Sequence, residues 1–291
     1  MKKKILVLGS TGMLGHRVCH YFLATNQYEV TDIAFRRKLR PDTIVLNVCN
    51  QEILERAIVN INPDYIINCI GVISKDKNHI ENAIYLNAYL PHQLKNFANR
   101  LHAKLIHIST DCVFSGIKGG YIESDDRDGR GIYAQTKILG EVNEHNHLTL
   151  RTSLIGPELK NNGSGLFHWF MSQQKSIEGY TKMIWSGVTT TELSKAIQWS
   201  INNEITGLYH ITNGHPTSKN DLLELFKKYT KKEIRINAVD GKCLDKSLID
   251  TRLLLDYQIP SYEKMISCMV DETARSKKFY SQYNLDPTSE K

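Results

Sequence analysis

Short apolar runs alternate with segments of helical periodicity through the first half of the chain. Continuously apolar runs predict buried strands, and apolar residues recurring every three or four positions predict amphipathic helices. The predicted strands cover residues 4–9, 29–35, 43–48, 65–70, 104–109 and 147–155, and the predicted helices cover residues 14–25, 52–59, 82–100 and 134–144. Because this alternation is typical of βαβ units, we expect an α/β fold with a doubly wound parallel sheet.

The second half of the chain is less regular. Helices are predicted at 166–174, 191–202 and 220–229, and strands at 207–212 and 234–239. The apolar strand at 207–212 is expected to extend the parallel sheet. The polar residues 281–291 are expected to form a disordered tail.

Composition narrows the class of protein. The chain has 291 residues, with 37 Lys and Arg against 31 Asp and Glu, so its formal charge is +6. The basic residues are scattered, which disfavours nucleic acid as a partner and leaves a mixed-charge surface or a polyanionic small molecule. Six widely spread cysteines suggest neither a metal site nor disulfides. No apolar run is long enough for a membrane span, so we expect a cytoplasmic protein without a membrane partner.

A glycine-rich turn follows the first predicted strand and opens the first predicted helix. Residues 9–15 read G-S-T-G-M-L-G, the order G-x-x-G-x-x-G. In this position glycines allow a tight turn and close approach to a diphosphate, and the helix N-terminus supplies N–H donors. The residues expected to bind a dinucleotide here are Gly9, Thr11, Gly12, Met13, Leu14 and Gly15.

The end of the second predicted strand bears on which nicotinamide cofactor would bind. Asp32 is expected inside the strand, which leaves Arg36 and Arg37 directly after it. An acidic residue at this edge would bind a ribose 2′-hydroxyl, whereas a guanidinium suits a 2′-phosphate. The sequence therefore favours NADPH over NADH, which stays an alternative, as does a merely solvated basic turn.

A tyrosine and a lysine have the spacing Y-x-x-x-K. Tyr133 and Lys137 share one face of a predicted helix, where the ammonium is expected to lower the pKa of the phenol. Such a tyrosine can exchange a proton with a carbonyl or alcohol oxygen. The strand at 104–109 ends in hydroxyl residues, among them Thr110, at the sheet edge where doubly wound folds bind ligands.

Glycine turn, strand-end hydroxyl and Y-x-x-x-K occur in this order, and the sequence resembles the extended short-chain dehydrogenase/reductases. Segment 109–116 (S-T-D-C-V-F-S-G) is similar to that of the dTDP-4-dehydrorhamnose reductase branch, and so are segments 150–156, 207–212 and 246–251. The resemblance implies a Rossmann domain (1–156 and 189–213) and a small discontinuous substrate domain (157–188 and 214–280). It also implies reduction of a 4-keto group on a nucleotide-activated sugar by NAD(P)H, for cell-surface polysaccharide synthesis, in a monomer or homodimer.

The resemblance also implies roles for individual residues. Tyr133 would donate the proton, Lys137 would hold the nicotinamide ribose, and Thr110 would polarise the carbonyl. Asn87 matches a family asparagine whose role the sequence does not define. The further residues implied for the cofactor are Asn47, Val48, Cys69, Ile70 and Gly71. Those implied for the substrate are Ser109, Thr110, Asp111, Phe114, Tyr133, Trp185 and Thr189.

Departures from the family pattern leave the substrate open. Cys112 stands where the branch usually has tyrosine, and segment 185–190 (W-S-G-V-T-T) replaces an expected D-Q-x-G-x-P-T. The first candidate is conversion of dTDP-4-dehydro-L-rhamnose to dTDP-L-rhamnose. The alternatives are reduction of a UDP-linked 2-acetamido-2,6-dideoxy-4-ketohexose and a non-catalytic NADP-binding regulatory subunit. His168 and Trp169 are expected either to cover the substrate or to form a packed helix face, and His107 is interpreted as a core residue.

Overall fold

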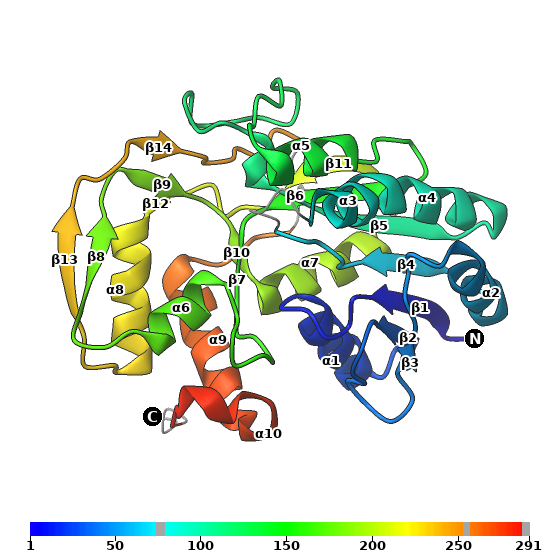
Figure 1. The fold of residues 1–291 in the computed structure, drawn as a ribbon, viewed down its shortest axis with the longest axis horizontal. Coiled ribbons are helices and arrows are strands. Elements are labelled where there is room, and N and C mark those ends of the chain that lie inside the picture. Colours follow the sequence, from blue (N-terminus) through cyan, green and yellow to red (C-terminus); the bar gives the residue numbers. More distant parts are fainter. Residues whose placement is uncertain (74–78, 253–256, 287–291) are drawn as a thin grey trace.

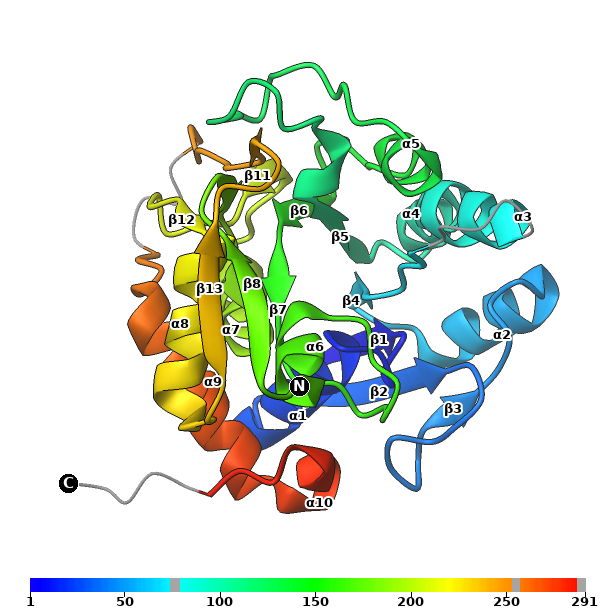
Figure 2. The ribbon, with the colours of Figure 1, turned by 60° about the vertical axis from the view of Figure 1, so that its left-hand side comes forward.

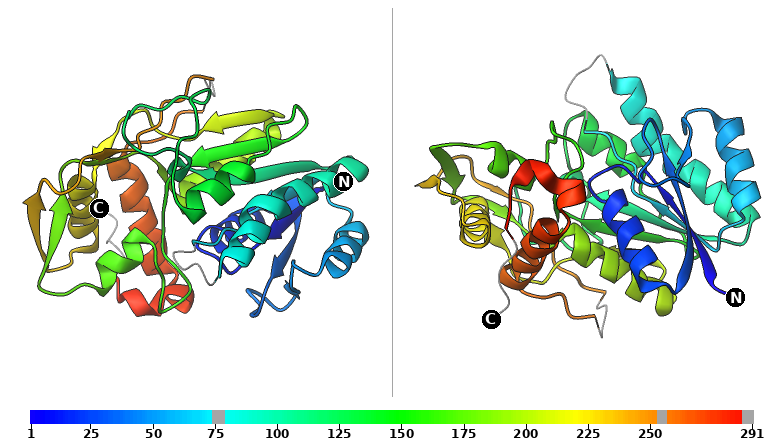
Figure 3. Two further views of the ribbon diagram at one scale, coloured as in Figure 1. Left: turned by 45° about the horizontal axis from the view of Figure 1, so that its top comes forward. Right: turned by 90° about the horizontal axis from the view of Figure 1, so that it is seen from below.

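The computed structural model describes residues 1–73, 79–252 and 257–286, which form two regions (Figure 1). We call the described residues of 1–156 and 189–213 the sheet region, because they contain the large central sheet. We call the described residues of 157–188 and 214–286 the cap region. Figure 3 shows the two regions side by side, with helices of the cap region lying next to the first helix of the sheet region.

Within the described part of the chain, the central sheet has seven strands, all parallel, in the order β11-β6-β5-β4-β1-β2-β3. Its strands are β1 (Lys3–Leu8), β2 (Tyr28–Ala34), β3 (Ile44–Val45), β4 (Tyr65–Asn68), β5 (Lys104–Thr110), β6 (Leu148–Thr152) and β11 (Gly207–His210). The chain winds outward from β1 to β3 and then restarts at β4 on the other side of β1. The predicted doubly wound α/β fold is confirmed, and ligands of such sheets bind outside the strand ends at this reversal.

Alternate side chains of β1 enter two separate cores. Ile5 and Val7 pack with helices α1 and α7 on one face of the sheet. Leu6 and Leu8 pack with α2 and α4 on the other face. The bounds are α1 (Gly15–Thr25), α2 (Gln51–Ile61), α4 (Leu90–Arg100) and α7 (Thr190–Asn202). Figure 2 shows the helices on both sides of the strands. Burial on both faces explains why the strand is continuously apolar.

The helix predicted at 82–100 is interrupted in its middle. It consists of α3 (Ile80–Ala83), the π-helix η2 (Ile84–Tyr89) and α4. Pro91 lies in the first turn of α4 and has no N–H to donate to the carbonyl of Asn87, four residues earlier. The loss of this bond explains why regular α-helical bonding is not continuous here. Single π-helical turns are frequent at functional sites, and η2 carries the buried Asn87.

The strand predicted at 147–155 divides at Ser153. β6 stays in the central sheet, whereas β7 (Leu154–Ile155) pairs with β10 (Val188–Thr189). The Ser153 carbonyl accepts from Val188 N–H at 3.0 Å, and its hydroxyl accepts from Trp185 Nε1 at 2.6 Å. These contacts turn the chain from the central sheet toward the cap region.

The cap region combines short strands with four helices. Its elements are α6 (Leu166–Ser172), β8 (Ser176–Tyr180), β9 (Met183–Trp185), β12 (Thr217–Ser218), α8 (Lys219–Thr230), β13 (Arg235–Val239), β14 (Leu244–Asp245), α9 (Tyr262–Arg275) and α10 (Lys277–Tyr280). β8 pairs in parallel with β13, and β9 lies between β12 and β14. The apolar pattern of the sequence does not predict β8, β9, β12, β14, α9 or α10. In the described residues, no helix is long and apolar enough to cross a membrane.

The expected disordered tail at 281–291 is wrong for residues 281–286. Ser281–Tyr283 forms the 3₁₀-helix η4, and both Tyr283 and Leu285 are buried. The Tyr283 hydroxyl accepts from Glu158 N–H at 2.9 Å and contacts His168 Nδ1 at 2.9 Å. Apolar packing by these two residues outweighs the polar composition of the segment. Residues 287–291 lie outside the described residues.

Candidate active site

The glycine turn lies where β1 meets α1, as predicted. Gly9 has φ +80°, and the N–H groups of Gly9 and Ser10 both donate to Ile33 O at the end of β2, at 2.9 and 3.1 Å. A Cβ at Gly15 would lie 2.2 Å from the Gly9 oxygen, so only glycine allows the helix to start this close to the turn. His16 Nδ1 donates to Gly12 O at 2.7 Å. The turn therefore has a fixed shape before any ligand binds.

A cavity of about 560 Å³ opens beside this turn. One wall, the glycine-loop wall, consists of residues 11–14 and 69–73. A second wall, the cap wall, consists of residues 158–160 and 164–165. The lining also includes the end of β5 and two residues of α5 (Ile132–Leu139), Tyr133 and Lys137. The cofactor candidates Thr11, Gly12, Met13, Leu14, Cys69, Ile70 and Gly71 all line this cavity.

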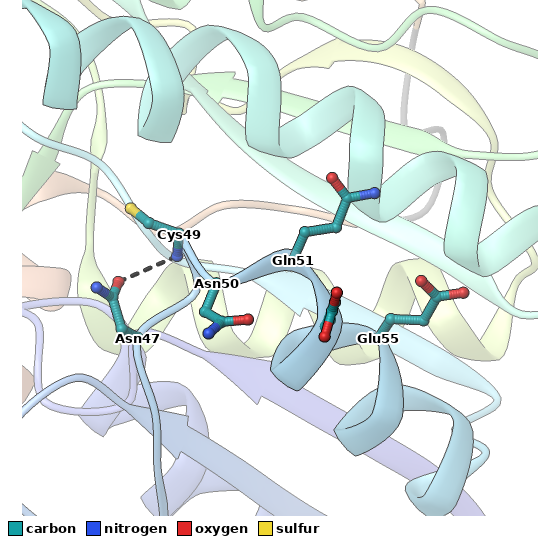
Figure 4. Close-up of a pocket in the computed structure, with 6 residues that line it drawn as sticks. Asn47, Cys49, Asn50, Gln51 and Glu55 are labelled. Carbon is teal, nitrogen blue, oxygen red and sulfur yellow. Dashed lines mark hydrogen bonds between the residues drawn. The ribbon is translucent and has the colours of Figure 1, made fainter.

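Asn47 lies outside this cavity, in a shallow depression at the N-terminus of α2 (Figure 4). Its Oδ1 accepts from Cys49 N–H at 3.0 Å. Val48, the neighbouring candidate, is buried in the core between the sheet and α2 and α4. The side chains of these two candidates therefore do not line the cavity beside the glycine turn.

Arg36 and Arg37 are exposed directly after β2, and neither lines the cavity. The Arg36 guanidinium lies 4.8 Å from the Phe35 ring centroid. As predicted, Asp32 lies inside β2, where it is fully buried and pairs with Arg40 Nε at 2.8 Å. Arg40 is not among the candidates read from the sequence. The exposed basic side chains that follow this strand end are Arg36, Arg37 and Lys38.

The three catalytic candidates, Thr110, Tyr133 and Lys137, line the same cavity, and we call this part of the lining its floor. Thr110 ends β5, and Tyr133 and Lys137 lie one turn apart on α5. The Thr110 hydroxyl donates to Asp111 Oδ1 at 3.0 Å and accepts from Cys112 N–H at 3.1 Å. The spacing Y-x-x-x-K and the strand-end hydroxyl thus converge on one site.

The predicted effect of Lys137 on Tyr133 is wrong for the free protein. Burial raises the pKa of Tyr133 well above its ordinary value, and the Thr110 side chain only partly opposes this. Lys137 Nζ donates to Ile108 O at 2.8 Å. Burial also lowers the pKa of Lys137 to about 8. Tyr133 is therefore a fully protonated phenol at neutral pH.

A buried ion pair supports the floor of the site. Arg151 on β6 makes two bonds of 2.8 Å to the carboxylate of Glu141, which also accepts from Ser109 Oγ at 2.5 Å. Burial alone would raise the pKa of Glu141, but the bonds from Arg151, Ser109 and Arg127 hold it below its ordinary value. The pair fixes the end of β5 relative to the segment after α5.

The substrate candidates fall into two groups. Thr110, Tyr133, Asp111 and Ser109 line the cavity, and so does Cys112. Burial raises the pKa of Asp111, while the ammonium groups of Lys219 and Lys246 oppose this rise.

Phe114, Trp185 and Thr189 are buried behind the cavity rather than lining it. Phe114 stacks on Tyr121 with ring centroids 4.2 Å apart. Trp185 donates to Ser153, and the Thr189 hydroxyl accepts from Glu192 N–H and caps α7. Aromatic and hydroxyl side chains serve such packing and capping as readily as ligand binding, so residue type alone did not distinguish the two.

The cap wall contains the residues that the sequence analysis missed. Glu158, Leu159 and Lys160 line the cavity together with Ser164 and Gly165. Glu158 Oε1 accepts from Gly165 N–H at 2.6 Å, which closes this loop. The glycine- and asparagine-rich segment 161–165 was the available signal. His168 is a packed helix residue that bonds Tyr283, and neither it nor Trp169 lines the cavity.

Asn87 connects the two sides of the floor. Its Oδ1 accepts from Val72 N–H, and its Nδ2 donates to Val72 O, both at 2.9 Å. Nδ2 also contacts Thr136 Oγ1 on α5 at 3.1 Å. This asparagine fixes the loop after β4 to the helix of Tyr133 and Lys137. In the described residues, no group of three His, Cys, Asp or Glu side chains could hold a metal ion.

Comparisons with known proteins agree with this geometry. The spore coat polysaccharide biosynthesis protein SpsK of Bacillus subtilis (strain 168) is 27% identical over 218 residues, which cover 72% of this chain and 73% of SpsK. Methionine adenosyltransferase 2 subunit beta of Bos taurus is 32% identical over 141 residues, which cover 48% of this chain and 42% of the bovine protein.

Among solved structures, the fold is similar to that of dTDP-4-dehydrorhamnose reductase from Bacillus anthracis str. Ames in complex with NADP. The TM-score is 0.80 at 23% identity, and the match covers 94% of this chain and 100% of that one. The model of the family described as "RmlD substrate binding domain" matches residues 2–246. The resemblance read from the motifs is thereby confirmed, and the chain belongs to the RmlD substrate-binding-domain family.

Proposed function

We propose that the protein reduces the 4-keto group of a nucleotide-activated deoxysugar with NADPH. The substrate we propose first is dTDP-4-dehydro-L-rhamnose, which would give dTDP-L-rhamnose for polysaccharide synthesis. The observation that carries the proposal is the convergence of Thr110, Tyr133 and Lys137 on one cavity beside the glycine turn. The names of SpsK and of the B. anthracis reductase support this class of substrate.

The residues around the cavity fit a nicotinamide dinucleotide. The N-terminus of α1 meets the cavity at residues 11–14, where N–H groups and the helix dipole favour a diphosphate. Lys137 and Tyr133 would hold the nicotinamide ribose. Arg36 and Arg37 would contact the 2′-phosphate that distinguishes NADPH from NADH. When bound, the dinucleotide supplies the hydride.

The remaining cofactor contacts of the proposal come from the edge of the sheet. Cys69, Ile70 and Gly71 would lie against the ribose and phosphate. Asn47 and the backbone of Val48 would face the adenine, in the depression near α2. Gly9 and Gly15 would act through the shape of the turn.

The chain's own residues supply the proton chemistry. A general acid must carry its proton at the working pH, and the buried phenol of Tyr133 meets this requirement. Thr110 would turn its hydroxyl proton from Asp111 Oδ1 to the same carbonyl oxygen. A charged Lys137 beside Tyr133 would stabilise the phenolate that remains after proton transfer.

The proposal assigns a role to each region. Residues 1–156 and 189–213 would bind the dinucleotide, and residues 157–188 and 214–280 would bind the nucleotide sugar. Asp111 lines the cavity, and the ammonium groups of Lys219 and Lys246 act on it from the cap region, so Asp111 is available for polar groups of the sugar. A UDP-linked 2-acetamido-2,6-dideoxy-4-ketohexose is the alternative substrate within the same chemistry.

A second candidate is a non-catalytic regulatory subunit that binds NADP. The observation in its favour is the similarity to methionine adenosyltransferase 2 subunit beta. A regulatory role needs no acid at the cavity floor. The presence of Thr110, Tyr133 and Lys137 together therefore favours the enzyme.

The two candidates are separated by incubation of the protein with NADPH and a panel of dTDP- and UDP-linked 4-ketosugars. Oxidation of NADPH with a ketosugar supports the reductase and identifies its nucleobase. NADPH binding without oxidation in the whole panel contradicts the reductase and supports the regulatory subunit.

A further inference from the structure

A buried histidine lies behind the catalytic lysine. His107 is in the middle of β5 and is fully buried. Its Nδ1 lies 3.2 Å from Asn68 Nδ2 on β4, and its Nε2 lies 3.4 Å from Lys137 Nζ on α5. The mechanism described above uses neither His107 nor Asn68.

The hydrogen bonds fix the tautomer of His107. Asn68 Oδ1 accepts from Ile70 N–H at 3.1 Å, which leaves Nδ2 of Asn68 facing the ring. Because Nδ2 is a donor, Nδ1 of His107 must accept and carries no proton. Burial, and then the charge of Lys137, lower the pKa of His107 well below its ordinary value, so the ring is neutral. Its single proton is therefore on Nε2 and faces Lys137.

This arrangement disfavours a charged lysine. An ammonium presents only N–H donors, and it would meet another donor at Nε2 of His107. An uncharged amine instead offers a lone pair to that N–H while still donating to Ile108 O. Burial of Lys137 acts in the same direction.

The other charged or titratable groups around Lys137 do not reverse this preference. Glu141, after α5, attracts the ammonium, but its carboxylate is bound by Arg151, Arg127 and Ser109. Tyr133, on the same helix, is a neutral phenol. The uncharged amine is thus favoured by burial and by a specific contact together.

We propose that His107 is a positioning residue that favours the uncharged amine of Lys137 in the free protein, so that at alkaline pH the binding of an anionic dinucleotide is coupled to proton uptake by Lys137. The inference rests on the proposed function, in which Lys137 holds the nicotinamide ribose. Phosphate charges and ribose oxygens favour the ammonium once the dinucleotide is bound. Affinity is then full below the pKa of free Lys137, about 8, and falls as the pH rises through it.

The test measures the dissociation constant of NADPH between pH 6.5 and 9.5 by its fluorescence. For the wild type we expect a constant value up to about pH 8 and then a rise of up to ~10-fold per pH unit. Isothermal titration at pH 8.5, in two buffers of different ionisation enthalpy, should show proton uptake. Lys137→Met should abolish both effects.

Two variants separate positioning from a structural role. In His107→Asn the side-chain oxygen can still accept from Asn68, but no N–H faces Lys137. The pH at which NADPH affinity begins to fall, called the midpoint below, should therefore move up by about one pH unit. His107→Gln can offer a carbonyl oxygen to the ammonium and should shift the midpoint at least as far. His147→Asn is the matched control, because buried His147 accepts from Leu105 N–H and does not contact Lys137. It should lower stability without moving the midpoint.

A wild-type affinity that does not change across this range overturns the inference, even if neither variant folds. An unchanged midpoint in folded His107→Asn or His107→Gln also overturns it. Since the measurement is binding, a protein that shows the proton-linked affinity yet reduces no ketosugar contradicts only the proposed reductase. A protein that reduces ketosugars with pH-independent NADPH affinity contradicts only this inference.

Discussion

The two walls of the cavity are held in place in different ways. The glycine-loop wall follows directly from β1 and β4, and its shape depends on bonds to the neighbouring strand end at Ile33. The cap wall depends on the far end of the chain, since Gln282 Nε2 donates to Glu158 O at 2.6 Å and the Tyr283 hydroxyl accepts from Glu158 N–H. One wall is therefore local to the sheet, and the other is built from segments distant in sequence.

This difference indicates where function can vary. A wall made from a strand end and a helix N-terminus offers N–H donors that suit any dinucleotide. A wall made from loops and a C-terminal turn can change its side chains without disturbing the sheet. The proton chemistry lies between the two, on β5 and α5, where the Glu141–Arg151 pair holds the floor.

The floor gives the largest expected effect. Tyr133→Phe removes the proposed proton donor but keeps the ring, so kcat should fall ~100-fold or more. The dissociation constant of NADPH should rise by no more than about tenfold, because only one hydroxyl contact to the ribose is lost. Steady-state kinetics and fluorescence titration measure the two values. A variant that keeps most of the wild-type kcat would show that Tyr133 is not the acid.

Glu141→Gln tests whether the floor depends on its buried ion pair. The substitution leaves Arg151 buried beside a neutral amide, and the free energy of unfolding should fall by about 3–5 kcal/mol. Urea denaturation measures this loss. The control is Glu144→Gln. The ion pair between Glu144 and Lys95 is partly exposed, so it should contribute at most about 1 kcal/mol to the free energy of unfolding. Equal losses in both variants would contradict the role given to the buried pair.

Arg36→Ala tests the outer part of the dinucleotide site. Loss of a guanidinium at a 2′-phosphate should raise the dissociation constant of NADPH ~10-fold and leave that of NADH unchanged. Arg56→Ala, on the exposed face of α2, serves as the charge-matched control and should change neither value. If both cofactors weaken equally in Arg36→Ala, Arg36 does not select between them.

Tyr283→Phe sharpens the comparison of the walls and has the smallest expected effect. It removes the acceptor for Glu158 N–H, so stability should fall by about 1–2 kcal/mol. KM for the ketosugar should rise several-fold while NADPH affinity stays near wild type. Tyr89→Phe, at an exposed position on η2, should change neither. Equal weakening of NADPH and ketosugar binding would mean that the two walls are not independent.

Most of the sheet region could be predicted from the sequence because its signals are local. The apolar run at 4–9 and the periodicity at 14–25 each reflect burial against immediate neighbours, and both elements form within a residue of the predicted bounds. The π-helical turn before Pro91 was missed, since it depends on one absent N–H within a regular apolar pattern. The short strands of the cap region carry too few residues to show a period.

The site residues show the same difference between local signals and long-range contacts. Thr110, Tyr133 and Lys137 were predicted because their order and spacing follow from one strand end and one helix turn. Trp185 and Thr189 were expected in the cavity but are engaged in packing and capping, which residue type does not reveal. Glu158 was missed because its position depends on residues more than a hundred positions away. The inner contact of His107 with Lys137 likewise exists only after β5 and α5 have packed together.

The proposed reductase activity depends on the residues at the cavity floor. It is tested most directly by measuring NADPH oxidation by the purified wild-type protein with dTDP-4-dehydro-L-rhamnose. We expect stoichiometric formation of dTDP-L-rhamnose, and we expect this activity to be lost in Tyr133→Phe although that variant still binds NADPH. Tight NADPH binding with no oxidation, for this substrate and for the other dTDP- and UDP-linked 4-ketosugars, would contradict it.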